Sequence, residues 1–271
     1  MANFFESGFT VLKELAREKM ETKARIEKIS NWIVDYAIKN KIESLVVGVS
    51  GGIDSAVVST LCAMTGMPTH VLSMPIRQKQ DQHDRSVNHC IWLLEKYPNV
   101  HWETIDLTET FESFEKLFPS NNKLALANSR SRLRMTTLYQ VAQENTGIVV
   151  GTGNKVEDFG VGFYTKYGDG GVDISPIADC LKTEVWEMGK ALGVSREIID
   201  AAPTDGLWDD DKTDEDQLGM TYPELEQAMK YAESGEQPRS AREKQNLLKF
   251  LSIQEKTKHK MRPIPVCILG D

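Results

Sequence analysis

Apolar residues gather in short runs, and between these runs apolar and polar positions recur with the period of a helix. Four runs are typical of strands: Ser44 to Val49, His70 to Met74, Val100 to Ile105 and Ile148 to Gly151. After the first run, Val57, Leu61 and Met64 share one side of a predicted helix. This alternation predicts a doubly wound parallel sheet flanked by helices, an α/β fold that binds ligands at the carboxyl ends of its strands.

Helical patterns also lie outside the strand-bearing region. Residues 3 to 40 predict two helices on the outside of the core, the second with apolar positions at Ile26, Ile29, Ile33 and Ile38. Residues 124 to 145 predict one alanine-rich helix that carries Arg130, Arg132 and Arg134. We expect a single domain over 1–271, made of N-terminal helices 3–40, a core over about 41–200, and a C-terminal loop and helices over 201–271.

Composition narrows the class of protein. The chain has 32 Lys plus Arg against 40 Asp plus Glu, a net charge of -8, which argues against nonspecific binding to nucleic acid or to an anionic membrane. No apolar run approaches the roughly 18 residues that span a bilayer. The four cysteines are widely separated and no secretory signal precedes them. We therefore expect reduced, mostly buried thiols and a cytoplasmic protein.

The segment from Gly48 to Ser55 joins the first strand to the following helix and is typical of an anion site. Gly51 and Gly52 let backbone N–H groups approach a phosphate, and the helix N-terminus adds a partial positive charge. Asp54 would repel a phosphate unless a divalent cation lay between them, so we interpret it as a magnesium ligand. The competing interpretation is a Gly-Gly turn whose serine or aspartate caps the helix.

The loop lacks the lysine of a Walker loop and the spacing of a dinucleotide fingerprint. Its sequence Ser-Gly-Gly-Ile-Asp-Ser resembles the pyrophosphate loop of the ATP pyrophosphatases. Downstream segments resemble the NAD synthetases, from about Ile26 to Lys260; these segments are 151–157, 162–173, 174–177, 181–182 and 203–204. The stretch Phe-Tyr-Thr-Lys-Tyr-Gly-Asp-Gly-Gly is the most distinctive of them. Residues 153–155 differ from the Asp-His-Ala of many bacterial members.

This resemblance implies a Rossmann-like fold of the adenine-nucleotide α-hydrolase kind, and it implies a reaction. The carboxylate of deamido-NAD is adenylated by ATP, ammonia displaces AMP, and NAD and pyrophosphate are formed, which is the last step of NAD biosynthesis. Glutamine-dependent members carry an additional glutaminase domain with a cysteine nucleophile. Fewer than fifty residues precede the loop here and none is cysteine, so free ammonia is the expected donor. The family also implies a homodimer and Mg²⁺ as cofactor.

Position by position, the resemblance assigns roles to residues of this chain. The catalytic residues would be Asp54, Lys182 and Thr204, and the magnesium ligands Asp54 and Glu157. Deamido-NAD would contact Arg132, Lys166, Asp173, His259 and Lys260. ATP would contact Gly48, Val49, Ser50, Gly51, Gly52, Ile53, Asp54, Ser55, Thr152, Lys182 and Thr204.

Several alternatives stay open. Taken alone, Lys182 and His259 would be surface charges, and the acidic run 209–216 would be a solvated loop. Arg130 and Arg134 are interpreted as helix-surface or partner contacts. Segments 160–171 and 204–216 are candidate lids. The rival functions are another pyrophosphate-loop ligase, a tRNA thiolase, or a nonenzymatic ATP-binding regulatory module.

Overall fold

The computed structural model describes residues 2–119, 122–204 and 213–269. Its strands form one parallel sheet in the order β3-β2-β1-β4. Every predicted strand is present, with bounds shifted by one or two residues: β1 Ser44–Gly48, β2 Thr69–Ser73, β3 Val100–Thr104 and β4 Gly147–Val149. Because β2 and β4 lie on opposite sides of β1, the predicted doubly wound topology is confirmed, with its switch point between β1 and β4.

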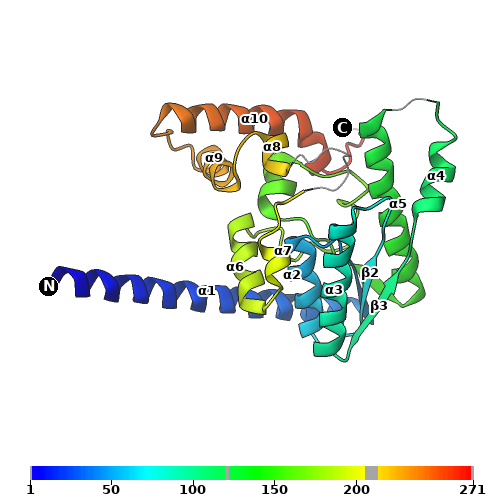
Figure 1. Cartoon of the computed structure of the whole chain (residues 1–271). Helices are drawn as coiled ribbons and strands as arrows, with labels where there is room; N and C mark the ends of the chain where they lie inside the picture. The colour runs from blue at the N-terminus through cyan, green and yellow to red at the C-terminus, as the bar shows by residue number, and fades with distance from the viewer. Residues whose placement is uncertain (1, 120–121, 205–212, 270–271) are drawn as a thin grey trace.

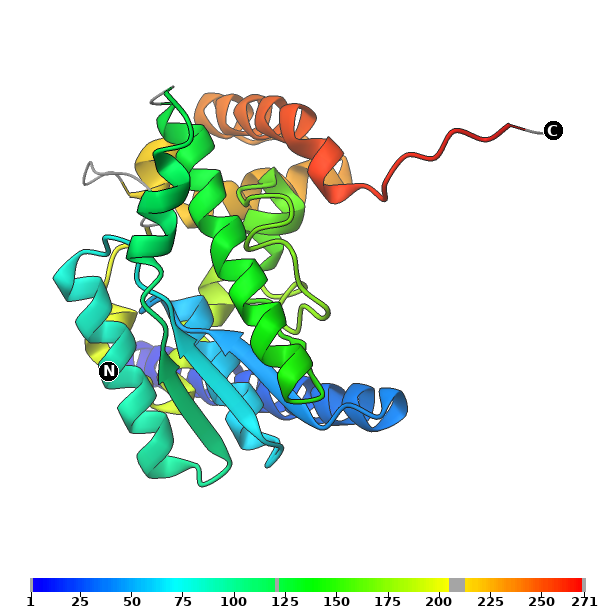
Figure 2. The same ribbon diagram turned by 90° about the vertical axis from the view of Figure 1, so that its right-hand side faces the viewer.

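Helices cover both faces of the sheet (Figures 1 and 2). In Figure 2, α5 crosses in front of the strands, while α2 and α6 lie behind them. Side chains alternate along the strands, so Val46 and Val149 pack beneath α5, whereas Leu45 and Val47 pack against α2 and α6. The helices of these two layers are α2 Ile53–Met64, α3 Gln80–Lys96, α4 Thr108–Glu115, α5 Lys123–Glu144, α6 Lys182–Leu192 and α7 Arg196–Ile199.

The N-terminal region forms one helix, α1 (Ala2–Asn40), where the sequence pattern predicted two. The stretch contains no proline, and its middle part is rich in strong helix formers, so nothing breaks the helix before Lys41, which has a φ of 57°. The helix packs on α2 and α6, outside the sheet, as expected. Ile33 is fully buried there, whereas Ile38 is 71% exposed and does not belong to the apolar face.

A smaller core joins the C-terminal helices to a short π-helix, η1 (Lys155–Val161). Val156 and Val161 pack there against Leu225 and Phe250. The first residues of the candidate lid 160–171 therefore belong to η1, and the loop begins after Val161. The helices on this core are α8 Asp214–Leu218, α9 Tyr222–Ser234 and α10 Ala241–Met261. None of the described helices is long and apolar enough to cross a membrane.

Three further expectations are settled by burial. Cys62, Cys90 and Cys180 are buried free thiols, and Cys267 is an exposed one, which confirms mostly buried, unpaired cysteines. Met64, at the end of α2, is 40% exposed and contributes little to the stripe formed by its neighbours. Half of the acidic run, residues 209–212, lies outside the described residues, but Asp214 is buried at the start of α8. The solvated-loop interpretation is therefore wrong for Asp214.

The burial of α1 yields a stability prediction. We expect Ile33→Ala to lower the free energy of unfolding by about 2–5 kcal/mol, because it removes apolar contacts and leaves a cavity. The matched substitution Ile38→Ala, on the exposed side of the same helix, should change that free energy by less than about 0.5 kcal/mol. Urea denaturation followed by circular dichroism measures both. Equal effects of the two substitutions would contradict the described packing of α1.

Candidate active site

The loop after β1 is held in place by hydrogen bonds of its own serines. The hydroxyl of Ser55 donates to the carbonyl of Gly52 at 2.9 Å, and Ser50 N–H donates to the Ser55 hydroxyl at 3.2 Å. Gly52 is the N-cap of α2 and provides no side-chain cap. The first-turn N–H groups of α2 can therefore donate to an anion.

Gly51 is required by both its conformation and its surroundings. Its φ is +85°, a left-handed value that glycine adopts without strain, and an added Cβ would lie 2.6 Å from the carbonyl oxygen of Gln82. Ser86, on the same helix α3, donates to the carbonyl of Val49 at 2.8 Å. The close approach of α3 thus fixes the loop from Gly48 to Ser55, called the phosphate loop below.

A buried lysine joins two carboxylates at the carboxyl end of the sheet. Lys182, the first residue of α6, is 2% exposed, and its Nζ lies 2.6 Å from Asp54 Oδ2 and 2.9 Å from Glu157 Oε1. Burial lowers the pKa of Lys182, but the two carboxylates outweigh burial and raise the pKa above its usual value. Lys182 is therefore an ammonium, and its interpretation as a surface charge is wrong.

Asn154 ties the same two carboxylates together. Its side-chain Nδ2 donates to Asp54 Oδ1 at 3.1 Å and to Glu157 Oε2 at 2.7 Å. Its Oδ1 accepts from the N–H groups of Val156 and Glu157 at the start of η1. Asn154 is fully buried. One side chain thus caps the π-helix and orients both acidic groups, a role that the sequence pattern did not reveal.

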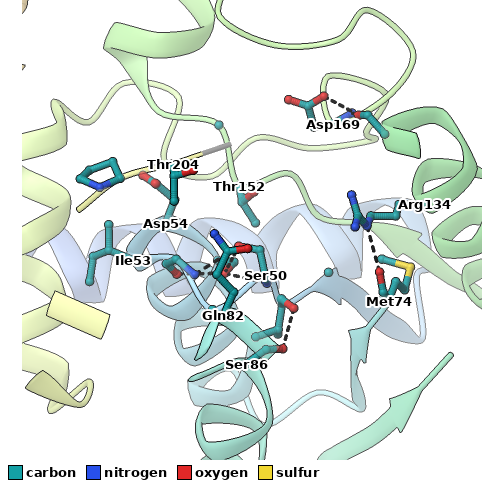
Figure 3. A pocket seen from close by; sticks show the side chains of 18 of the residues that line it. Ser50, Ile53, Asp54, Met74, Gln82, Ser86, Arg134, Thr152, Asp169 and Thr204 are labelled. Carbon is teal, nitrogen blue, oxygen red and sulfur yellow. Dashed lines mark hydrogen bonds between the residues drawn. The ribbon is translucent and has the colours of Figure 1, made fainter. Parts of the chain in front are cut away.

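These groups border a pocket of about 310 Å³. The phosphate loop forms one wall, and Thr152 and Thr204 approach Asp54 from two other segments (Figure 3). The structure thus brings together every residue that the sequence assigned to ATP or to the metal. The pocket volume lies at the lower end of the range for small-molecule sites.

The opposite wall contains two residues that the sequence analysis did not assign to the site. Arg134 donates to the carbonyl of Met74 at 2.9 Å and to the side chain of Gln78 at 3.1 Å, and burial lowers its pKa to about 10. Asp169 accepts from the Ser131 hydroxyl at 2.6 Å. Figure 3 shows both groups across the pocket from Asp54. The helix-surface alternative for Arg134 is therefore wrong, and the partner-contact alternative stays a prediction.

The residues assigned to deamido-NAD lie outside this pocket. Arg132 donates to the carbonyl of Lys166 at 3.3 Å, and the Lys166 ammonium donates to the carbonyl of His259 at 3.2 Å. Lys260 donates to the carbonyl of Tyr164 at 2.7 Å. These residues of α5, the 162–171 loop and α10 form one neighbouring group.

Asp173 is separate from that group. Its carboxylate accepts from the Tyr139 hydroxyl at 3.1 Å and from the N–H of Val149 at 2.8 Å. It therefore anchors the segment that follows the 162–171 loop to β4 and α5.

The donor set at Asp54 and Glu157 suits a hard divalent cation. The two carboxylates already hold the Lys182 ammonium between them. Among the described residues, no group of three or more acidic, histidine or cysteine side chains could hold a metal ion by itself. Magnesium is commonly bound by one or two carboxylates together with substrate phosphates and water. The residues present therefore fit Mg²⁺ delivered with a nucleotide.

The fold and the pocket define a class: an α/β nucleotide-binding protein with a phosphate loop at its switch point and an acidic pair beside it. The sequence profile of the NAD synthase family matches residues 25–264. The chain belongs to the NAD synthase family.

Individual relatives are similar over most of their length. The NH(3)-dependent NAD(+) synthetase of Mesoplasma florum is 40% identical, over 76% of this chain and 84% of the relative. That of Carboxydothermus hydrogenoformans is 35% identical, over 88% and 94%. The structure of an NMN synthetase from Francisella tularensis superposes with a TM-score of 0.79 at 34% identity, over 91% of this chain and 98% of that one.

The contacts of Asn154 yield a second prediction. Asn154→Asp keeps an oxygen that can cap η1 but replaces the amide donor by a third carboxylate facing Asp54 and Glu157. We expect kcat/KM for ATP to fall by about 10–100-fold.

The matched control is Asn122→Asp at the N-cap of α5, where the side chain accepts only from the N–H of Ala125. Aspartate and asparagine are comparable N-caps, so this variant should keep its activity. Steady-state kinetics measures both. An Asn154→Asp enzyme as active as the Asn122→Asp enzyme would show that the amide bridge has no part in the site.

Proposed function

We propose that this chain catalyses the ATP-dependent amidation of deamido-NAD to NAD with ammonia as nitrogen donor. The single observation that carries the proposal is the buried arrangement of Lys182, Asp54 and Glu157 beside the phosphate loop, in a chain of the NAD synthase family. The NH(3)-dependent NAD(+) synthetases that it resembles support ammonia as the donor.

In the first step, the nicotinic acid carboxylate of deamido-NAD attacks the α-phosphorus of ATP. Both reactants are anions, so the site must align them and neutralise the charge that develops. The loop from Gly48 to Ser55 and the hydroxyls of Thr152 and Thr204 would bind ATP, and Lys182 would neutralise phosphate charge. When bound by Asp54 and Glu157, Mg²⁺ would supply electrostatic stabilisation of the departing pyrophosphate.

In the second step, ammonia adds to the activated carbonyl carbon and AMP leaves. Water competes with ammonia for the adenylate, so the pocket must exclude it. The 162–171 loop borders the pocket through Gly168 and Asp169, and Pro203 and Thr204 border it from another side. These two segments are our candidates for closure. The central part of the second one, residues 205–212, lies outside the described residues.

The remaining assignments complete the proposal. The residues that would bind deamido-NAD are Arg132, Lys166, Asp173, His259 and Lys260. The hydrogen bonds of Arg132 with Lys166 and of Lys166 with His259 support a common binding region beside the ATP pocket. Lys260 bonds to Tyr164 of the same loop. Mg²⁺ is the proposed cofactor, and a homodimer in the cytoplasm is the proposed state of the enzyme.

A second candidate substrate is favoured by one observation. The structure with a TM-score of 0.79 to this chain is an NMN synthetase, and its sequence is 34% identical. Amidation of the corresponding mononucleotide would use the same ATP site and the same chemistry. The two candidates differ only in whether the substrate carries an adenylate half.

The reaction itself gives the third prediction. Purified enzyme with ATP, Mg²⁺, deamido-NAD and ammonium should form NAD, AMP and pyrophosphate in equal amounts, detected by mass spectrometry and a pyrophosphate assay. Omitting ammonium, or replacing it with glutamine, should abolish NAD formation. Asp54→Ala should lower the rate by at least about 100-fold, because it removes a metal ligand. Pyrophosphate release that needs no nicotinate substrate would disprove the proposed reaction.

The choice between the two substrates gives the fourth prediction. We expect kcat/KM for deamido-NAD to exceed that for nicotinic acid mononucleotide by about tenfold or more, because contacts with the adenylate half add binding energy in the transition state. Parallel initial-rate measurements at saturating ATP and ammonium give the ratio. A ratio below one would identify the mononucleotide as the substrate and leave the amidation chemistry unchanged.

A further inference from the structure

Tyr222 contacts the acidic pair from a helix that no sequence pattern linked to the site. It is the first residue of α9 and is 1% exposed. Its hydroxyl donates to Glu157 Oε1, the oxygen that also accepts from Lys182. Burial, followed by the charge of Glu157, raises the pKa of this hydroxyl, so it remains a donor at neutral pH.

The ring of Tyr222 has separate contacts. The Lys182 ammonium lies 5.0 Å from the ring centroid, and the indole of Trp186 meets the ring edge-on at 5.6 Å. The hydroxyl thus acts on Glu157, whereas the ring packs against Lys182 and Trp186. A phenylalanine at this position would keep the ring contacts and remove only the hydrogen bond.

The hydroxyl also reaches the second segment that borders the pocket. Asp214 Oδ2 lies 3.4 Å from it, and the N–H of Asp214 donates to the carbonyl of Pro203 at 3.0 Å. Pro203 precedes Thr204 on the pocket wall. Tyr222 therefore lies between the carboxylate of Glu157 and the base of the segment that carries Thr204.

From these contacts we propose that Tyr222 is a positioning residue that holds the Glu157 carboxylate in the orientation in which it binds the divalent cation. The inference rests on the proposed function of the site. Glu157 Oε2 is held by Asn154, and Oε1 is shared by Lys182 and Tyr222. If Lys182 turns towards a phosphate, Tyr222 and Asn154 still fix both oxygens. The carboxylate then stays oriented without its lysine partner.

Metal binding tests this role without the reaction. Mn²⁺ is titrated into the enzyme with α,β-methylene-ATP, an analogue that cannot release pyrophosphate, and free Mn²⁺ is measured by electron paramagnetic resonance. We expect Tyr222→Phe to weaken Mn²⁺ binding by about 10–100-fold. Its thermal unfolding should resemble that of the wild type, because the ring contacts remain.

The same helix provides a matched control. Tyr231 is also buried, and its hydroxyl donates to Glu243 at 3.1 Å, in a contact with α10 rather than with the acidic pair. Tyr231→Phe removes a buried tyrosine hydroxyl of α9 and should bind Mn²⁺ within about twofold of the wild type, since no metal ligand loses a partner. If both substitutions weakened Mn²⁺ binding equally, the inference would be overturned, because the weaker binding would then come from a less stable α9.

A double-mutant cycle tests whether Tyr222 acts on Mn²⁺ binding through Glu157, which a purely structural role would not require. In the Glu157→Gln background, Tyr222→Phe should weaken Mn²⁺ binding no further, because both changes act through one carboxylate. Additive effects, or Tyr222→Phe binding Mn²⁺ like the wild type, would refute the proposed role. The binding assay contains no deamido-NAD and no ammonia, so it is independent of the reaction. If the wild type binds Mn²⁺ with nucleotide but forms no NAD in the activity assay, the proposed function is wrong and the role of Tyr222 is not affected.

Discussion

The active site depends on one buried ammonium between two carboxylates. Lys182 contacts Asp54 on α2 and Glu157 on η1, and so joins three segments that are distant in sequence. Burying such charges costs several kcal/mol per ion, which close contacts and further hydrogen bonds only partly recover. Asn154 and Tyr222 supply those hydrogen bonds. A buried charged cluster of this kind contributes little to the stability of the fold, and it is typical of sites that bind charged ligands.

The topology explains why these groups meet. Asp54 follows β1, and Asn154 and Glu157 follow β4, and these adjacent strands lie at the point where the order of the sheet reverses. Crossover connections leave in opposite directions there, so a crevice opens above the carboxyl ends of the two strands. The π-helix then directs Glu157 back towards α2, and the small core behind η1 anchors that helix to α9 and α10.

The sequence predicted the strands and their parallel pairing, and it singled out the residues that line one wall of the pocket, because glycines, hydroxyls and an aspartate in fixed spacing have few structural uses. It did not predict η1, since a π-helix has no periodic signature of its own. Asn154 offered one usable signal: an asparagine before an acidic residue is a common N-cap. Tyr222 offered none, because a tyrosine at a helix start contacts a distant carboxylate only once tertiary packing has placed α9.

The charge of the cluster indicates how it would respond to a nucleotide. Two carboxylates and one ammonium carry a formal charge of -1, and the pocket above them is bordered by backbone N–H donors of the phosphate loop. ATP alone would bring negative charge towards this cluster, whereas ATP with a divalent cation brings the charge that the carboxylates lack. Asp54 and Glu157 would hold such a cation, and the Lys182 ammonium beside them would supply a donor for phosphate charge. The charge of the cluster thus favours a nucleotide that carries a divalent cation over a free nucleotide.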